Sequence, residues 1–149
     1  MRHCGRNKKG FTLIEIVVVI AIIGILGAIA TMSGMAIIKN NEKKAAATSV
    51  KNYWKLSTQT FNQLNLGYKN AKKATDLKTF LAAQLGTNEL VVSTAECSAL
   101  KEGGIYVQYL QDSKNTNNRY QLIALSYNYK GRIFYTTDGK NVYEMKKKT

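Results

Sequence analysis

The order of apolar and polar residues divides the chain into two parts of different character. From Ile16 to Ile38 the chain runs for 23 residues without a charged side chain. An α-helix of that length rises about 34 Å, and the hydrocarbon core of a membrane is about 30 Å thick. We therefore expect residues 11–38 to form a hydrophobic transmembrane or assembly helix, and residues 39–149 to form a globular head.

The helix is predicted to continue into the head with an amphipathic pattern. Apolar residues recur there at intervals that place them on one face of a helix with 3.6 residues per turn, namely Ala46, Val50, Tyr53, Phe61 and Leu64. Proline is absent, so nothing interrupts a single helix from about Thr12 to about Leu66, ended by Gly67. We expect this second half to be a spine that packs on a sheet, with Trp54 in the core between them.

The remainder of the head is predicted to be one short helix followed by strands. Residues 76–85 are predicted to form a helix with one apolar face. Thr75 or Asp76 would be its N-cap, and Gly86 lies just past its end. Residues 90–92 could form a short strand, and the alternation from about residue 105 to 146 indicates β structure, with Asp138-Gly139 as the strongest hairpin signal. The predicted fold class is α+β: a long helix packed on an antiparallel sheet of three or four strands.

Charge and cysteine content narrow the possible environments. The formal net charge is +13, and the four basic residues of the first ten positions leave +9 for the chain from Phe11 onward. A surplus of this size favours anionic partners such as DNA or acidic surfaces, although lysine-rich domains also use such charge for solubility alone. Loss of the N-terminal segment would remove Cys4 and leave Cys97 alone, which excludes an internal disulfide.

The N-terminus fits neither a secretory signal peptide nor a plain membrane anchor completely. A signal peptide has 7–15 apolar residues before a small-residue cleavage site. The segment Ala28-Ile29-Ala30 resembles such a site, but the apolar run is too long. An uncleaved anchor fits the length, with the basic flank in the cytoplasm. Neither explains Glu15, because a carboxylate near a membrane core is costly and implies a partner.

The residues around Glu15 carry a resemblance to a known family. The segment Lys8-Lys9-Gly10-Phe11-Thr12-Leu13-Ile14-Glu15, followed by an unbroken apolar helix, resembles the class III leader of type IV prepilins and pseudopilins over about residues 6–38. The resemblance implies residues 1–10 as a leader peptide, cut by prepilin peptidase between Gly10 and Phe11, with N-methylation of Phe11. The predicted order of a long helix followed by an antiparallel sheet also resembles the pilin fold.

Simple electrostatics supports a role for Glu15 in assembly. Cleavage after Gly10 would create a cationic amine on Phe11 in apolar surroundings, one helical turn from Glu15. Pairing the two charges, within one chain or between neighbours, removes much of the cost of burying each. Pairing between chains would also set the axial register of the subunits.

The apolar helix contains small residues but lacks a proline that many pilins have in this region. The stretch from Ile29 to Gly34 contains no proline, and glycines are its only helix-weakening residues. Spacings of four residues between small side chains allow close helix packing, although glycine is also common in membrane helices. The candidate packing positions are Gly24, Gly27, Ala28 and Gly34.

The sequence gives little support for catalysis, so we expect a protein that is not an enzyme and has no cofactor. The single histidine is His3, within the leader, so Cys97 has no histidine partner after cleavage. The Asp138–Asn141 segment resembles a calcium loop only weakly, because one carboxylate in a tight turn is a poor site for a cation that needs six or more oxygens. We expect no metal site.

A second candidate surface is aromatic and basic. Six of the nine tyrosines lie between Tyr106 and Tyr135, close in sequence to the basic residues Lys130, Arg132 and Lys140. Such a surface could stack on bases and neutralise phosphates of DNA. Tyrosine is also an ordinary strand former, and this explanation stays open.

These observations lead to one leading hypothesis and two alternatives. The leading hypothesis is a type IV pilin-like structural subunit. It is held in the cytoplasmic membrane with its N-terminus inside and then assembled into an extracellular pilus for adhesion, aggregation or twitching motility. Its partners would be itself, other pilins, prepilin peptidase, the pilus assembly machinery and the membrane. The first alternative is a pseudopilin of a type II secretion or competence DNA-uptake machine. The second is an uncleaved, membrane-anchored binding domain.

Overall fold

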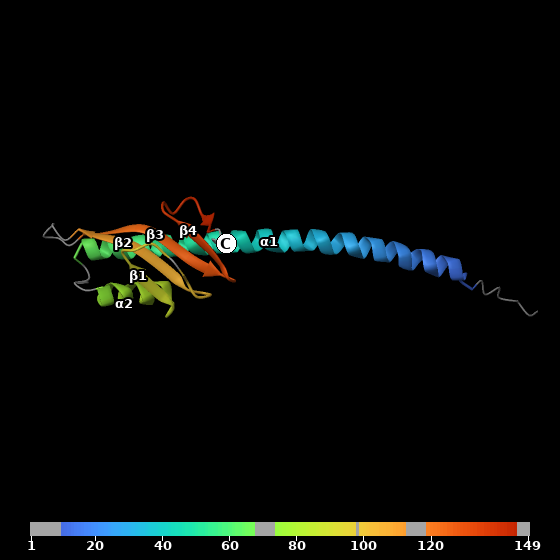
Figure 1. Cartoon of the computed structure of the whole chain (residues 1–149), viewed down its shortest axis with the longest axis horizontal. Coiled ribbons are helices and arrows are strands. Elements are labelled where there is room, and N and C mark those ends of the chain that lie inside the picture. Colours follow the sequence, from blue (N-terminus) through green and yellow to red (C-terminus); the bar gives the residue numbers. More distant parts are fainter. Residues whose placement is uncertain (1–9, 68–73, 98, 113–118, 146–149) are drawn as a thin grey trace, which may run out of the picture. The chain divides into compact units, whose positions relative to one another are not determined.

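The computed structural model describes residues 10–67, 74–97, 99–112 and 119–145; the basic residues of the leader lie outside these ranges. The chain divides into two compact units, residues 1–42 and 43–149, called here the N-terminal and C-terminal units. The elements are α1 (Leu13–Asn65), α2 (Ala74–Leu85), β1 (Leu90–Ser93), β2 (Ile105–Asp112), β3 (Arg119–Tyr129), β4 (Arg132–Thr136) and β5 (Tyr143–Glu144) (Figure 1).

Helix α1 is continuous for 53 residues, which confirms the prediction to within a residue at each end. It ends where Gly67 adopts a left-handed backbone, with φ of +78°, and its N–H donates to the carbonyl of Leu64 at 3.1 Å. Glycine takes this conformation without the steric cost that a Cβ brings, so it terminates the helix. The part of α1 up to Glu42 belongs to the N-terminal unit and the rest to the C-terminal unit.

Helix α2 confirms the predicted short helix but not its predicted start. It begins at Ala74, so neither Thr75 nor Asp76 is the N-cap, and Asp76 lies instead within the first turn. An acidic side chain there still interacts favourably with the positive end of the helix dipole. The C-terminal end follows the prediction: Gly86 has a φ of +66° and donates its N–H to the carbonyl of Ala82 at 2.9 Å.

The sheet has five strands in the order β1-β2-β3-β4-β5, so it is larger than the three or four strands expected. Strand β1 pairs with β2 in parallel, whereas all the other pairs are antiparallel. The parallel pair requires the chain to cross from one end of the sheet to the other, and residues 94–104 make this crossing. The hydroxyl of Tyr106 donates a hydrogen bond to the carbonyl of Ala95. The side-chain amide of Asn128 donates one to the carbonyl of Leu100. This connection therefore covers the face of β2 and β3 that is turned away from the helices.

A β-bulge corrects the simple alternation that the sequence suggested for β3. Gln108 pairs with Ala124 but Tyr109 pairs with Leu122, so Ile123 is an extra residue in β3. An extra residue changes which side chains point to each face of a sheet. The core residues of β3 are consequently Tyr120 and Leu122 before the bulge, and Leu125 and Tyr127 after it.

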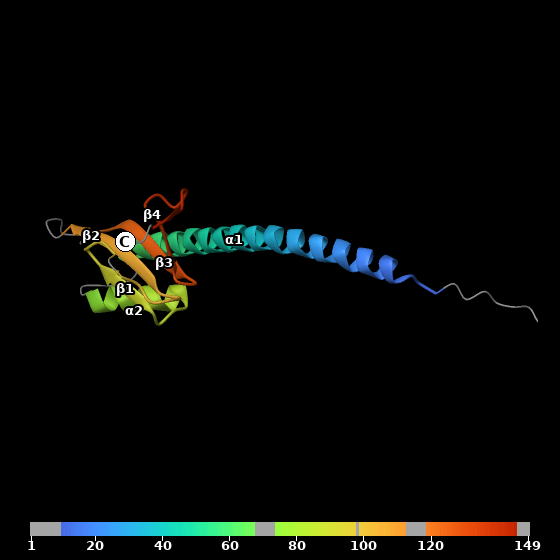
Figure 2. The ribbon, with the colours of Figure 1, turned by 45° about the vertical axis from the view of Figure 1, so that its right-hand side comes forward.

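One hydrophobic core holds the C-terminal unit together. Figures 1 and 2 show the second part of α1 lying against the sheet and α2 lying beside β1. The predicted stripe on α1 is confirmed, because four of its five residues are buried and Tyr53 is half-buried. Asn65 also exchanges two hydrogen bonds with the backbone of Tyr120, which ties the end of α1 to β3. The buried core consists of Ala46, Val50, Phe61, Leu64, Leu77, Leu81, Leu85, Leu90, Ile105, Val107, Tyr109, Tyr120, Leu125 and Phe134.

Trp54 packs on this core, as predicted, and the turn between β4 and β5 lies against its indole. A Cβ added to Gly139 would stand 2.2 Å from Cδ1 of Trp54, and the φ of Gly139 is +69°. Glycine is therefore required at this position for two reasons, the backbone conformation and the close approach to the ring.

We expect Gly139→Ala to destabilise the protein more than Gly131→Ala. Gly131 also has a positive φ, +75°, but a Cβ there would meet nothing within 4 Å. Its replacement should cost about 1 kcal/mol for the left-handed backbone alone. The overlap with Trp54 should add about 1–3 kcal/mol at Gly139. Thermal unfolding of the two variants in detergent micelles measures the difference, and equal destabilisation would contradict the contact.

Candidate functional site

The start of α1 is built by a reciprocal set of hydrogen bonds between Thr12 and Glu15. The backbone N–H of Thr12 donates to Oε2 of Glu15 at 2.8 Å, and the Thr12 hydroxyl donates to the same oxygen at 2.9 Å. The N–H of Glu15 donates in return to the Thr12 carbonyl at 3.1 Å and approaches the Thr12 hydroxyl oxygen at 3.4 Å. This is a capping box, which satisfies backbone donors that the first turn of a helix leaves free.

The capping box holds the Glu15 carboxylate at the helix N-terminus, next to the predicted cleavage point. Gly10 and Phe11 precede the helix, and 85% of the Phe11 surface is exposed. A Cβ added to Gly10 would meet nothing within 4 Å. The peptide bond between these two residues is therefore exposed and outside regular structure.

Thr12 is the residue of this site whose role the sequence reasoning missed. The signal was present, because a threonine followed three residues later by a glutamate before an apolar run is the pattern of a capping box.

We expect Thr12→Ala to loosen the first turn of α1, whereas Thr12→Ser should preserve it. Alanine removes the hydroxyl that donates to Glu15, and loss of such a cap costs about 1 kcal/mol. Amide hydrogen exchange of the chain in detergent micelles should show faster exchange at residues 13–16 in the alanine variant only. Unchanged exchange in both variants would show that the cap contributes nothing.

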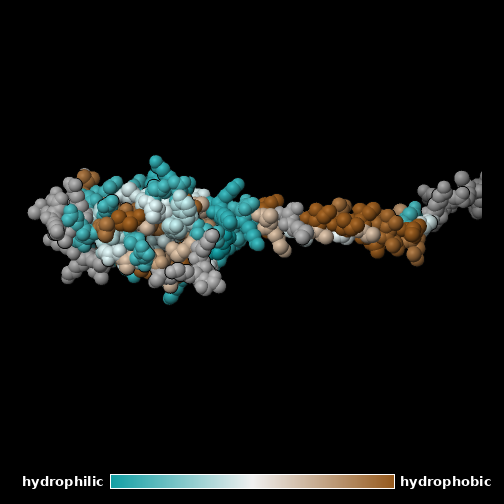
Figure 3. Space-filling view, turned by 45° about the horizontal axis from the view of Figure 1, so that its top comes forward, coloured by the Kyte–Doolittle hydropathy of each residue, from teal (hydrophilic) through white to brown (hydrophobic). Residues whose placement is uncertain are grey.

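The rest of α1 in the N-terminal unit presents an almost entirely apolar surface. The exposed fraction of the described large apolar side chains from Phe11 to Ile38 runs from 46% at Val17 to 85% at Phe11. Figure 3 shows this apolar stretch and the hydrophilic residues that follow it. By length and composition, α1 is the one helix of the described chain that could cross a membrane. The apolar segment is thus consistent with membrane anchoring.

The candidate packing positions on this helix have room for a larger side chain. A Cβ added at Gly24, Gly27 or Gly34 would meet nothing within 4 Å. The hydroxyl of Thr31 donates to the carbonyls of Gly27 and Ala28, at 3.2 and 2.9 Å, so this polar group is satisfied within the helix. The fold of a single chain therefore does not require these glycines.

The candidate anion-binding residues of the C-terminal unit are divided between two turns. Lys130 forms the β3–β4 turn, with its ammonium 5.7 Å from the centre of the Tyr129 ring, and Arg132 follows at the start of β4. Lys140 lies on the turn that contacts Trp54 through Gly139. The structure thus brings Lys130 and Arg132 together in one hairpin and places Lys140 in another.

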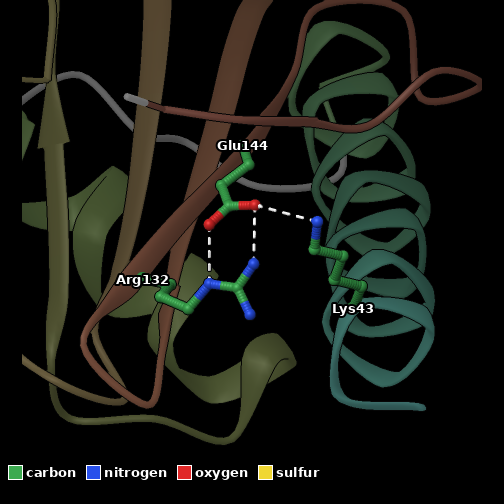
Figure 4. Close-up of polar contacts among 3 residues, drawn as sticks. All are labelled: Lys43, Arg132 and Glu144. Carbon is green, nitrogen blue, oxygen red and sulfur yellow. Dashed lines mark hydrogen bonds and ion pairs between the residues drawn. The ribbon is translucent and has the colours of Figure 1, made fainter. Parts of the chain in front are cut away.

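Arg132 is engaged by an acidic residue that the sequence reasoning did not consider. Its Nε and Nη2 donate to Oε1 and Oε2 of Glu144, both at 2.6 Å, and Lys43 of α1 lies 3.7 Å from the same carboxylate (Figure 4). The bonds from Arg132, and less strongly the charge of Lys43, hold the pKa of Glu144 below its usual range. One carboxylate therefore links β5, β4 and α1, and the three groups together carry one net positive charge.

The weak calcium-loop candidate is a turn organised around Asp138. Its Oδ1 accepts the N–H groups of Lys140 and Asn141, both at 2.8 Å, and the hydroxyl of Thr136, while Oδ2 accepts the side-chain amide of Asn141. The N–H of Asn141 and then that of Lys140 contribute most to lowering the pKa of Asp138 to about 2. Both carboxylate oxygens thus serve the turn, and among the described residues no three His, Cys, Asp or Glu side chains form a metal-binding group.

We expect the Asp138 turn to make stability dependent on pH in the acid range. The folded-state pKa is below the ordinary value of 3.8, so the charged carboxylate stabilises the fold above about pH 4. This contribution should disappear as the pH falls through about 2. Thermal unfolding from pH 5 to pH 2 should show a smaller loss of stability in Asp138→Ala than in the unchanged chain, because Glu144 still contributes. Glu102→Ala, which removes an exposed acidic group from another turn, should keep the full loss.

Cys97 has no features of a reactive nucleophile. It is half-buried in the 94–104 connection, where burial raises the pKa of its thiol and a hydrogen bond with Ser126 only partly opposes this. A thiol with a raised pKa carries little of the reactive thiolate.

Comparison with known proteins identifies the N-terminal segment. Residues 5–31 match the family model described as the prokaryotic N-terminal methylation motif, which is the class III leader of type IV pilins. No curated protein and no solved structure matches the chain. The motif supports a type IV pilin- or pseudopilin-like precursor, a structural subunit rather than an enzyme, and in general implies processing by prepilin peptidase and assembly into pilin polymers.

Proposed function

We propose that this protein is a type IV pilin subunit, cut between Gly10 and Phe11, methylated at Phe11 and assembled into an extracellular pilus. The observation that carries the proposal is the methylation motif at residues 5–31, which leads directly into an exposed apolar helix. The exposed Gly10–Phe11 bond, outside the helix, supports cleavage at this position. Before assembly, the apolar stretch would hold the chain in the cytoplasmic membrane with its N-terminus inside.

Glu15 would act as the assembly residue through its position in the capping box. Cleavage would leave an ammonium group on Phe11, within four residues of the Glu15 carboxylate. In a single chain, Thr12 satisfies this carboxylate with two hydrogen bonds to Oε2. In a fibre, the amine of a neighbouring Phe11 would pair with Glu15, since a buried charge is costly unless it is paired. The glycines at 24, 27 and 34, which the single chain does not need, would let neighbouring helices approach closely, with Ala28 beside them.

The C-terminal unit would form the outer part of the fibre and carry its interactions. The whole chain from Phe11 onward has a charge of +9, which favours anionic surfaces. Lys130 and Lys140 are exposed and could contribute contacts to DNA or to other acidic surfaces, while Arg132 would do so only in competition with Glu144. Adhesion, aggregation or motility would be the task of such a fibre.

A pseudopilin of a secretion or competence machine is the second candidate, because the class III leader is common to both groups. Such a subunit would share the cleavage, the methylation and the Glu15 pairing. It would differ in forming a short fibre that is not released from the cell surface by shearing.

We expect the chain recovered by shearing cells to begin at methylated Phe11. Glu15→Ala and Glu15→Gln should each greatly reduce the sheared protein, because neither side chain can pair with the Phe11 amine as a charge. Both should leave the amount of protein in the membrane unchanged. Mass spectrometry of the N-terminus and immunoblots of the sheared and membrane fractions provide the measurement.

Three other results would change the conclusion. A chain that begins at Met1 and occurs only in membranes would overturn the proposal and indicate an uncleaved anchored domain. A cleaved chain that depends on Glu15 but never appears in the sheared fraction would support the pseudopilin. Normal amounts of the Glu15 variants in sheared fibres would exclude the pairing role of Glu15.

A further inference from the structure

Beyond Lys39, which directly follows Ile38, the basic residues of α1 fall into two groups at different distances from its apolar stretch. Lys43 and Lys44 come five and six residues after Ile38, about 8–9 Å along the helix axis. Lys51 and Lys55 come 13 and 17 residues after it, about 20 and 26 Å along the same axis. All four side chains are exposed. If Ile38 marks the end of the membrane-spanning stretch, Lys39 and the first pair lie near the membrane surface, whereas the second pair does not.

The neighbourhood of Lys43 keeps a positive charge in spite of its ion pair. The Glu144 carboxylate lies 3.7 Å from the Lys43 ammonium, but Arg132 already binds both of its oxygens at 2.6 Å (Figure 4). More than half of the Lys43 side chain, 55%, is exposed. The negative charge of Glu42 offsets one of the two positive charges of Lys43 and Lys44. The positive charge of Lys39 compensates for Glu42, so the local net charge stays at two positive charges. The ammonium of Lys43 is therefore accessible to a further anion.

Strand β4 and the turn before it bring further basic residues close to Lys43, because Arg132 and Lys43 contact the same carboxylate of Glu144. Arg132 begins β4 and pairs in register with Tyr129, so the turn at Lys130 is next to it. Lys130 is exposed and has a φ of +52°, in the left-handed region, where glycine or asparagine would be more usual.

We propose that Lys43 and Lys44, with Arg132 and Lys130, form a collar that binds the anionic phospholipid headgroups of the membrane in which the unassembled subunit is held. The inference rests on the membrane-held state of the proposed function. Basic residues directly beside a membrane span gain favourable energy from anionic lipids, and this attraction fades within a Debye length of about 8 Å at physiological salt. Lys43 and Lys44 are at that distance, and Lys51 and Lys55 are well beyond it.

A lipid surface fits these positions better than a nucleic acid does. Both offer phosphodiester anions, but the collar follows the apolar stretch immediately on one continuous helix, so headgroups would surround it whenever that stretch is in a membrane. Tyr129, the aromatic ring under Lys130, is only half-buried, yet it packs on Tyr127 and the core rather than standing free to stack on a base. Binding to the membrane would retain the subunit until assembly withdraws its helix from the lipid.

Lysine acylation of the full chain in vesicles tests this proposal within one molecule. Vesicles of phosphatidylcholine are compared with vesicles that also contain phosphatidylglycerol, and the modified lysines are quantified by mass spectrometry. We expect Lys43 and Lys44 to be modified roughly fivefold more slowly in the anionic vesicles. Lys51 and Lys55 should react at similar rates in both. Raising the salt to about 1 M, where the Debye length is about 3 Å, should remove the difference.

Paired variants give a second, independent readout through Trp54, the single tryptophan. Energy transfer from Trp54 to dansyl-labelled headgroups should rise when phosphatidylglycerol is added, because the collar draws the C-terminal unit toward the surface. The rise should be absent in Lys43→Gln/Lys44→Gln and retained in Lys51→Gln/Lys55→Gln. The two double variants remove the same charge from the same helix, so net charge alone cannot explain a difference between them.

Results that would overturn the collar can be told apart from results that would overturn the proposed function. Flotation of the vesicles shows first whether the chain inserts, and failure to float would count against the membrane-held precursor itself. A chain that floats but shows equal acylation of Lys43 in both vesicles would overturn the collar. Protection of Lys43 and Lys44 that requires added duplex DNA, and not anionic lipid, would also overturn it and assign these residues to nucleic acid.

Discussion

The apolar stretch of α1 imposes the constraint on which the rest of this protein depends. Its described large side chains are 46–83% exposed along the helix, with no covering element in the described part of the N-terminal unit. At roughly 25 cal/mol per Å², leaving so much apolar surface in water is strongly unfavourable. A membrane or the helices of other subunits must therefore cover it. The leader motif at residues 5–31 is consistent with membrane anchoring and in general implies assembly into pilin polymers.

The same constraint explains why the charged groups lie only at the two ends of the stretch. At the N-terminal end Glu15 is satisfied by Thr12, so the one carboxylate near the apolar region has hydrogen-bond donors even before any partner arrives. At the other end lysines resume after Ile38 and continue along α1. A carboxylate with local hydrogen bonds can exchange them for a stronger partner. A carboxylate without any donor would oppose insertion of the helix into the membrane from the start, because the cost of removing it from water is not offset.

The C-terminal unit obtains its stability in a different way, from a core that the second part of α1 shares with α2 and the sheet. It has no disulfide among the described residues, and Cys97 is a free thiol. Polar contacts support the core at defined points. Asn65 joins α1 to β3, Asp138 shapes the turn on Trp54, and Glu144 links the last strand to both β4 and α1. These contacts secure the C-terminal end of the chain, where β5 contributes two residues to the sheet.

Periodic patterns by themselves determined the long helix, its apolar and amphipathic parts, the buried stripe from Ala46 to Leu64 and the α+β class, and the leader was found through its resemblance to a known family. Each of these depends on the spacing of neighbouring residues along the chain, which a sequence displays directly. The tertiary structure decided the fifth strand and the parallel pairing of β1, because a crossing connection depends on which distant segments meet. It also decided the bulge at Ile123, which exchanged the two faces of β3, and the start of α2 ahead of its expected caps. The pairing of Arg132 with Glu144 and the contact of Gly139 with Trp54 join residues 12 and 85 positions apart, and no local pattern encodes such distances. The Thr12–Glu15 box was encoded locally, but only the geometry showed that the carboxylate serves as a helix cap.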